Sequence, residues 1–251
     1  MNSIYDRADI YDLIETEQRA EIYKKHWEQV FQGTDIHTLL DVSVGSGNVT
    51  LPLAALGIEI SGSDLSDTML ARCREKAARR GVKMDLRQSD FRDLHCWDGI
   101  CFDCVASTGN ALPYVPNSDL PSALARMDSL VKPGGYLYFG SRNWDQILRE
   151  RKRFYLYNPF FDGETRVNLV QVWDYLPDNS MIFNLLYTFE KDNRIFQQEQ
   201  FEEHYYPVSR QFLLDQLRAL GYGEIRQSCF PTILGQEPEN AEWYCVLAQK
   251  R

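Results

Sequence analysis

The sequence has 251 residues, of which 44% are hydrophobic and 25% are charged, and its formal net charge is −9. This composition is typical of a globular chain with a sizeable core, so it excludes extended disorder and fibrous repeats. The acidic balance gives no surplus of cations for binding a polyanion, so we expect no nucleic acid as the main partner.

The N-terminal residues carry charges throughout and contain no apolar segment of the kind found in signal peptides. No window of the sequence is long and apolar enough for a transmembrane helix. The six cysteines are spread along the chain and are expected to be reduced thiols. We therefore expect a cytoplasmic protein without a membrane partner, and the sequence does not indicate its oligomeric state.

Strands and helices alternate over the first 143 residues. Spacing of apolar residues and helix caps predicts, in chain order, an amphipathic helix at 8–31, a strand at 38–44, a helix at about 48–56, a strand ending at Asp64, a helix from Ser66 to about Arg80, strands at 82–90 and 102–108, a helix at 119–131 and a strand at 136–143. This order predicts a doubly wound α/β fold, with a parallel sheet between helices.

The character of the chain changes at residues 150–206. This segment is rich in β-branched and aromatic residues, with turn signals at 177–179 and 192–193. It predicts antiparallel strands that form an insertion over the ligand crevice, like a lid. A helix from Ser209 to Gly221 and a closing pair of strands at 223–230 and 242–250 complete the predicted fold.

A glycine-rich turn follows the first strand. Dinucleotide sites of the usual kind have a third glycine where this sequence has Thr50, so a pyrophosphate site is disfavoured. An acid at Asp41 followed by Gly45 and Gly47 resembles the S-adenosylmethionine (SAM) turn of class I methyltransferases. The resemblance implies a Rossmann-like fold with a mostly parallel seven-stranded sheet, and SAM as cofactor at these residues. The alternative is a tight turn without a ligand.

Acidic residues also end the next two strands. A carboxylate at Asp64 can accept hydrogen bonds from both ribose hydroxyls of a nucleoside, and the resemblance places Asp90 and Phe91 at the adenine. Leu65 and Ser107, after strand two and at the end of strand four, are expected to join this cofactor site. Each acid alone has a simple structural alternative, but the carboxyl ends of parallel strands meet at one edge of the sheet.

Further segments resemble the glycine and sarcosine N-methyltransferases over most of the chain. They are DLIETEQRAE (12–21), DVSVGSG (41–47), GSDLSDTML (62–70), TGNALPYV (108–115), VKPGGYLYFGSRNWDQIL (131–148) and HYYP (204–207). The resemblance implies one methyltransferase domain over residues 1–251 that methylates a small amine or amino acid, such as glycine or sarcosine.

The same resemblance implies roles for individual residues. Arg19 would pair with the methionine carboxylate of SAM, a role that suits a guanidinium. Asn143, Asn110 and Tyr206 would orient the amine, with Tyr205 a weaker candidate than Tyr206. Tyr11 would lie near the site. The structural alternatives are a solvated arginine, turn or strand-end asparagines, and aromatic side chains of the core.

The sequence departs from this family at one position. Mammalian-type members hold the amino-acid carboxylate with an arginine where this sequence has Asn179. A desolvated carboxylate without a cation is costly, so Arg142 or Arg166 would have to replace that arginine, or the substrate is another amine.

Three alternatives stay open on the residues. The pair Cys101 and Cys104 suits neither zinc nor redox chemistry well, because a second pair is missing and the pair does not open a helix. An O- or C-methyltransferase for a small molecule fits the same cofactor residues. A protein that binds SAM or S-adenosylhomocysteine (SAH) without turnover also fits them.

Overall fold

The computed structural model describes residues 3–251, which form two sheets with helices around one of them. The helices are α1 (Ala8–Tyr11), α2 (Glu17–Val30), α3 (Asp67–Arg79), α4 (Leu120–Asp128), α5 (Trp144–Glu150) and α6 (Arg210–Ala219). The strands are β1 (Thr38–Asp41), β2 (Glu59–Asp64), β3 (Met84–Gln88), β4 (Phe102–Ser107), β5 (Val131–Arg142), β6 (Phe154–Leu156), β7 (Phe160–Asp162), β8 (Thr165–Tyr175), β9 (Met181–Lys191), β10 (Arg194–Tyr205), β11 (Tyr222–Cys229) and β12 (Trp243–Lys250).

The larger sheet has seven strands in the order β11-β12-β5-β4-β1-β2-β3. Strands β1 to β5 pair in parallel, and β12 lies antiparallel to both β5 and β11. The order of the strands reverses beside β1, and in open α/β sheets such a reversal opens a crevice at the carboxyl ends of the strands. The predicted doubly wound, mostly parallel seven-stranded fold is confirmed.

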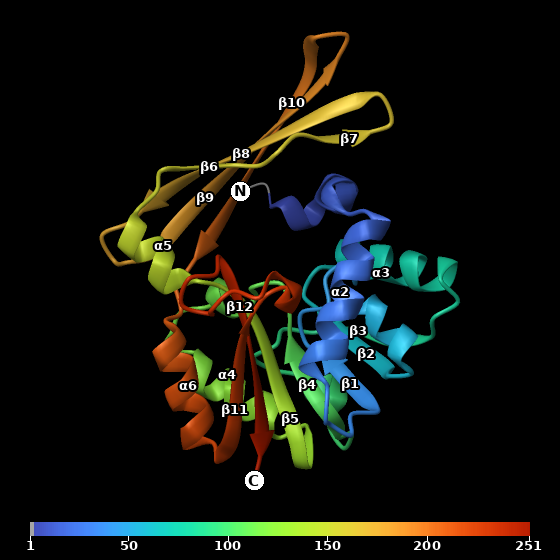
Figure 1. Cartoon of the computed structure of the whole chain (residues 1–251), viewed down its shortest axis with the longest axis vertical. Helices are drawn as coiled ribbons and strands as arrows, with labels where there is room; N and C mark the ends of the chain where they lie inside the picture. Colours follow the sequence, from blue (N-terminus) through green and yellow to red (C-terminus); the bar gives the residue numbers. More distant parts are fainter. Residues whose placement is uncertain (1–2) are drawn as a thin grey trace.

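Alternation along the central strands supplies both faces of this sheet with apolar side chains. Leu40 of β1 belongs to a core with the apolar residues of α4 and α6. Its neighbour Leu39 belongs to the opposite core, with Trp27 and Val30 of α2. Figure 1 shows α4 and α6 on one side of the sheet and α2 on the other.

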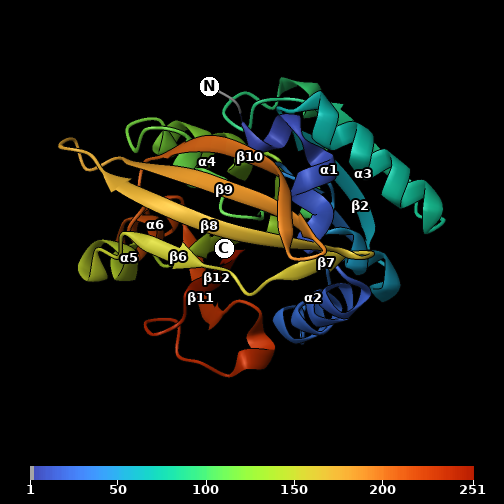
Figure 2. The same cartoon turned by 90° about the horizontal axis from the view of Figure 1, so that it is seen from above.

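The second sheet is an antiparallel insertion between α5 and α6, with the order β10-β9-β8-β6 and β7 paired to β8. Inward residues alternate with outward ones along β8 and β9, and Trp173 pairs with Phe183 and Leu169 with Tyr187. Figures 1 and 2 show this insertion sheet lying across the end of the larger sheet. It corresponds to the insertion predicted at about 150–206.

Two predicted helices differ in the structure. The helix expected at 8–31 is interrupted after a 3-10 turn at Asp12–Ile14, because Thr16 adopts an extended backbone and its hydroxyl accepts a hydrogen bond from the Arg19 amide to start α2. The helix expected at 48–56 is a 3-10 helix, Leu51–Leu56, with a proline in its first turn. In residues 3–251, no helix has the length and apolarity needed to span a membrane.

Candidate active site

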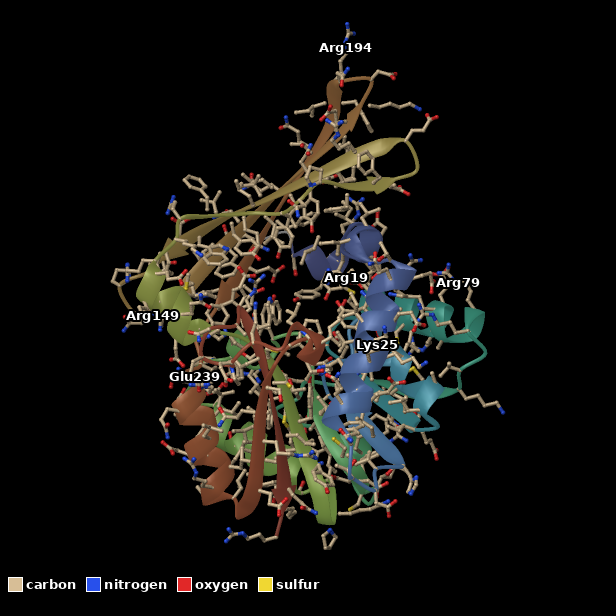
Figure 3. The ribbon with its side chains drawn as sticks, in the orientation of Figure 1. Arg19, Lys25, Arg79, Arg149, Arg194 and Glu239 are labelled. Carbon is tan, nitrogen blue, oxygen red and sulfur yellow. The ribbon has the colours of Figure 1, made fainter. Side chains whose placement is uncertain are left out.

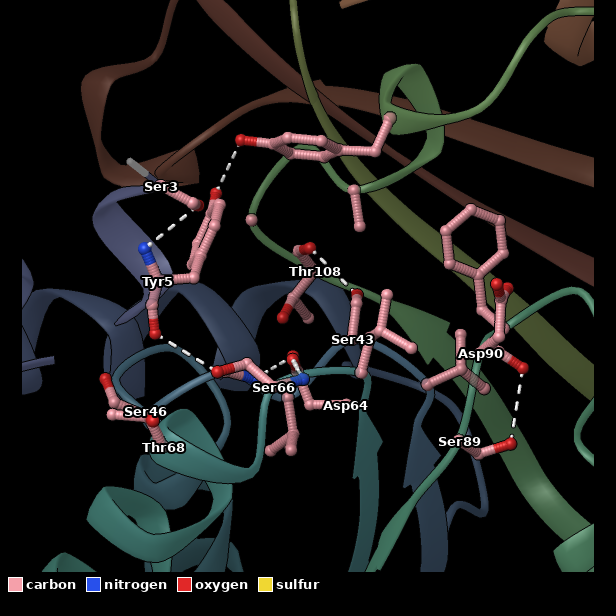
Figure 4. Close-up of a pocket in the computed structure, with 18 of the residues that line it drawn as sticks. Ser3, Tyr5, Ser43, Ser46, Asp64, Ser66, Thr68, Ser89, Asp90 and Thr108 are labelled. Atoms are coloured by element: carbon pink, nitrogen blue, oxygen red, sulfur yellow. Dashed lines mark hydrogen bonds between the residues drawn. The ribbon is translucent and has the colours of Figure 1, made fainter. Parts of the chain in front are cut away.

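A cavity of about 580 Å³ lies at the carboxyl ends of β1 to β4. We call it the strand-end cavity; residues 42–46, 64–68, 89–92 and 108–109 form most of its wall. Figure 4 shows Asp64 and Asp90 on different sides of it, with Tyr5 facing them from the N-terminal segment. Its size falls within the range of about 300–1,000 Å³ that is usual for ligand sites.

Asp41 lies behind the wall of this cavity and connects the segments that form it. The carboxylate is fully buried and accepts hydrogen bonds from the hydroxyls of Thr50 at 2.5 Å and Thr108 at 2.7 Å. Burial raises the pKa of the Asp41 carboxyl. The expected SAM-turn acid therefore ties together the segments that follow β1 and β4.

The two glycines of the turn have different functions. Gly45 lies on the cavity wall at φ +54°, and a Cβ there would meet no atom within 4 Å. Gly109, at φ +68° after β4, is alike in both respects. By contrast, a Cβ on Gly47 would lie 2.8 Å from the Cys73 sulfur of α3. Gly45 and Gly109 thus leave room for a ligand close to the backbone, whereas Gly47 lets α3 pack against the turn.

Asp64 lies where the sequence predicts, at the end of β2 and on the wall of the cavity. One carboxylate oxygen accepts a hydrogen bond from the Gly45 amide at 2.8 Å, and the other accepts one from the Ser66 amide at 2.9 Å. Burial raises the pKa of this carboxyl. Each oxygen keeps a lone pair for a further donor, such as a ligand hydroxyl.

The remaining expected cofactor residues divide into two groups. Leu65, Asp90 and Phe91 line the strand-end cavity, and the Asp90 carboxylate pairs with Arg92 at 2.6 Å. Ser107 lies behind the wall, where its hydroxyl is 3.2 Å from that of Ser43.

The N-terminal segment and strand β10 contribute residues to the strand-end cavity that the sequence analysis did not predict. Glu203 of β10 accepts hydrogen bonds from the Ser3 hydroxyl at 2.7 Å and the Ile4 amide at 2.9 Å, and the Ser66 hydroxyl donates to the Tyr5 carbonyl. Both Tyr5 and Glu203 line the cavity. Because β10 and the N-terminus are distant in sequence, no local pattern brings them together.

A second cavity, of about 520 Å³, lies between the larger sheet and the insertion sheet. We call it the insertion cavity. Its walls come from α2, the insertion strands and the segment 230–243. The two cavities share five wall residues: Tyr5, Tyr11, Asn48, Val49 and Gly109. The two cavities are therefore adjacent along these five residues.

Hydroxyl groups are concentrated near the shared wall. The Tyr114 hydroxyl donates to that of Tyr5 at 2.9 Å and lies 2.6 Å from the hydroxyl of Tyr205. Burial raises the pKa of all three tyrosines, so they stay neutral at physiological pH. Neutral hydroxyls can both donate and accept hydrogen bonds.

The insertion cavity receives some of the residues expected to contact SAM or the acceptor. Arg19 lies on its wall, with one nitrogen 2.7 Å from the Tyr23 hydroxyl and an ion pair to Glu15 at 3.3 Å. Asn110 also lines it, and its side-chain oxygen accepts hydrogen bonds from the Arg142 amide and the Trp144 indole. In Figure 3, Arg19 lies beneath the insertion sheet, whereas Arg79, Arg149 and Arg194 lie at the edge of the molecule.

Two expected acceptor residues have other positions. The side-chain oxygen of Asn143 caps α5 by accepting a hydrogen bond from the backbone N–H of Gln146. The side-chain nitrogen donates to the backbone carbonyls of Pro238, Glu239 and Ala241. Neither cavity wall includes Asn143 or Tyr206. Strand alternation at the end of β10 turns Tyr205 toward the insertion cavity and its neighbour Tyr206 toward His204.

The cysteine pair set aside on the sequence has an arrangement unsuited to a shared metal. Cys101 is exposed, whereas Cys104 is buried in β4. Over residues 3–251, no group of three potential ligands is arranged to hold a metal ion.

Comparison with known proteins relates this arrangement to a family. Residues 39–135, which include β1 to β4 and the strand-end cavity's main segments, match the methyltransferase domain family. A SAM-dependent methyltransferase from Clostridium acetobutylicum superimposes over 98% of both chains with a TM-score of 0.76 at 17% identity. The fold is that of class I SAM-dependent methyltransferases.

Two curated proteins similar to this chain are named for different activities. A glycine/sarcosine N-methyltransferase from Parasynechococcus marenigrum is 30% identical over 58% of this chain and 52% of its own length. A ubiquinone biosynthesis O-methyltransferase from Xanthomonas axonopodis pv. citri is 32% identical over 42% and 43%. The chain thus spans about half the length of the curated relatives it matches.

The donor set of the strand-end cavity fits SAM. A buried carboxylate at Asp64 suits ribose hydroxyls, Phe91 offers an aromatic face, and Gly45 and Gly109 leave space that side chains would fill. An anionic wall also suits the positive sulfonium of SAM better than it suits a pyrophosphate.

Proposed function

We propose that this protein is a SAM-dependent methyltransferase that methylates a nitrogen of a small amine or amino acid. The observation that carries the proposal is the shared wall of Tyr5, Tyr11, Asn48, Val49 and Gly109, which makes the strand-end cavity and the insertion cavity direct neighbours. Methyl transfer is an in-line displacement and needs this end-to-end placement of donor and acceptor.

The strand-end cavity would hold SAM. Asp64 would accept hydrogen bonds from the ribose hydroxyls, Asp90 and Phe91 would contact the adenine, and residues 43–46 would approach with their backbone. Arg19, on the far side of the shared wall, is our candidate for the methionine carboxylate. When bound, SAM supplies an electrophilic methyl group on its sulfonium sulfur.

The chain's own contribution is to orient the acceptor and exclude water. The insertion sheet and the N-terminal segment cover the shared wall, and Glu203 holds that segment through Ser3 and Ile4. The neutral hydroxyls of Tyr114 and Tyr205 can direct an amine lone pair without contributing a charge. Such positioning can supply a large part of the rate of a bimolecular transfer.

The test measures SAH release from purified protein supplied with SAM and a panel of amines that includes glycine, sarcosine and phenylalanine. Turnover with an amine, with the product heavier by one methyl group on nitrogen, supports the proposal. SAM binding without turnover on any amine or other small acceptor would instead favour a protein that binds SAM or SAH without catalysis.

Transfer to oxygen is the second candidate. It is favoured by the O-methyltransferase relative and by the aromatic wall of the insertion cavity, which includes Tyr155, Tyr187 and Trp243. Fragmentation of the methylated product distinguishes an N-methyl from an O-methyl group.

A further inference from the structure

The strongest unassigned feature of the insertion cavity is Arg142, the last residue of β5. Its side chain is on the cavity wall, yet the residue is only 8% exposed. Within residues 3–251 it forms no ion pair, and its guanidinium makes one hydrogen bond, from Nη2 to the Tyr157 hydroxyl at 3.2 Å. An arginine stays charged at every physiological pH, so this is a buried cation without an anionic partner.

Aromatic rings surround this guanidinium. Its central carbon lies 4.8 Å from the ring centre of Trp243 and 5.7–5.8 Å from those of Tyr155, Trp173 and Phe183. Rings attract a cation, but a desolvated guanidinium gains most from an anion that it binds through two parallel hydrogen bonds. The rings therefore fix the orientation of Arg142 and leave its free nitrogens available for such an anion.

Tyr157 provides a second donor at the same place. Its hydroxyl oxygen accepts hydrogen bonds from Arg142 and from the Gln171 amide at 3.4 Å. With both lone pairs used, the hydroxyl hydrogen is left to donate, and the structure gives it no acceptor among residues 3–251. Arg142 and Tyr157 together thus present positive charge and a hydroxyl donor to the cavity.

The rest of the wall combines charged pairs with an apolar region. Glu15 pairs with Arg19, and Glu242 accepts a hydrogen bond from the Tyr155 hydroxyl at 2.6 Å. Leu169, Leu185 and Tyr187 come from the insertion strands, and Phe230, Pro231 and Leu234 come from the C-terminal segment. The cavity volume of about 520 Å³ is much more than a two-carbon amino acid fills, and it lies within the range of drug-sized ligand pockets, about 300–1,000 Å³.

We infer that the acceptor is an amphiphilic monoanion, with a carboxylate bound to Arg142 and Tyr157 and an apolar or aromatic body against the insertion strands. Arg142 forms no ion pair, whereas the Glu242 carboxylate on the same wall already accepts a hydrogen bond from Tyr155, and the planar guanidinium matches a planar carboxylate. The inference rests on the proposed function, because it takes the insertion cavity as the acceptor site. It assigns the carboxylate to Arg142 rather than to Arg166, which is half exposed and pairs with Glu190.

The experiment titrates SAH-loaded protein with phenylacetate and with phenylacetamide, its neutral analogue of the same shape, by calorimetry. We expect phenylacetate to bind at least about tenfold more tightly than phenylacetamide and more tightly than acetate. Arg142→Met should abolish the preference for the carboxylate, and Arg166→Met, which removes an arginine from strand β8 of the insertion sheet, should leave it intact. Arg142→Lys should keep part of the preference, because the charge remains and the planar fork is lost.

Equal binding of the two aromatic probes to the wild type, no binding of either, or a preference that survives in Arg142→Met overturns the inference. The comparison on the wild type decides even if Arg142→Met does not fold. Titration of SAM and SAH into the same samples separates the two proposals. If SAH binds and the carboxylate preference is missing, only the inference about Arg142 fails. If neither SAM nor SAH binds, the proposed function fails. In that case, titration of the two aromatic probes without SAH still shows whether Arg142 binds a carboxylate.

Discussion

Asp64→Ala removes the carboxylate at the end of β2 that the cofactor assignment depends on. The side chain holds the Gly45 and Ser66 amides and keeps a lone pair on each oxygen for the ribose hydroxyls. A hydrogen bond to a charged group contributes about 1.5–3 kcal/mol, and water replaces part of that loss in an open cavity. We expect SAM binding to weaken by about 3 kcal/mol, or roughly two orders of magnitude in Kd.

Calorimetric titration of SAM into the variant measures this change, and a thermal melt reports whether the variant is folded. Asp85→Ala is the matched control, since Asp85 lies on the neighbouring strand β3 with a half-exposed side chain paired to Arg87. The control should bind SAM like the wild type. A folded Asp64→Ala protein with unchanged Kd for SAM would refute the placement of the ribose at β2.

Three further predictions address the shared wall, the turn and the core. Tyr205→Phe removes the hydroxyl beside Tyr114, so it should lower kcat/KM about tenfold and leave the Kd for SAM unchanged. Tyr206→Phe should change neither quantity, because Tyr206 packs against His204. Equal effects of the two variants in a kinetic assay would contradict the placement of Tyr205 at the acceptor site. Gly47→Ala should destabilise the fold by about 2–4 kcal/mol in chemical denaturation, since its Cβ would press on the Cys73 sulfur at positive φ, and a loss below about 0.5 kcal/mol would argue against that packing. Burial lowers the pKa of His26 to about 3, so the folded state excludes a proton that the unfolded state binds below about pH 6.5. The contribution of His26 to the free energy of unfolding is therefore complete above that pH and is lost as the pH falls. From about pH 7.5 to about pH 5.5, the free energy of unfolding of the wild type should fall by about 1.4 kcal/mol more than that of His26→Gln. Parallel plots of the free energy of unfolding against pH for the two proteins would show that His26 is not buried as a neutral ring.

The strand ends were the most predictable part of the molecule. Asp64 and Asp90 follow strands whose alternation and turn residues are local features, and parallel strands bring their carboxyl ends to one edge. The antiparallel insertion was predictable for the same reason, because β-branched and aromatic residues alternate over β8 and β9. Local patterns of this kind need no knowledge of the tertiary fold.

Side-chain roles that depend on distant segments were not predictable. The Asn143 side chain is used by α5 and by the loop at 238–241, which lies almost a hundred residues away in sequence. To predict that Tyr205 rather than Tyr206 faces the insertion cavity, the register of β10 against β9 must be known. A shift of one residue would turn each side chain of β10 to the opposite face of the insertion sheet. The aromatic surroundings of Arg142 come from β6, β8, β9 and β12 together, so only the folded chain shows why this arginine rather than Arg166 faces the cavity.

The most direct test of the two-cavity account follows a labelled methyl group from SAM to glycine, sarcosine, phenylalanine and phenethylamine. The account predicts label on an amine that carries both a carboxylate and an apolar body, with phenylalanine ahead of glycine and of phenethylamine, and a large loss of transfer in Asp64→Ala. Transfer to phenethylamine as efficient as to phenylalanine would contradict the role of Arg142. Failure of the folded protein to bind SAM would contradict the account as a whole.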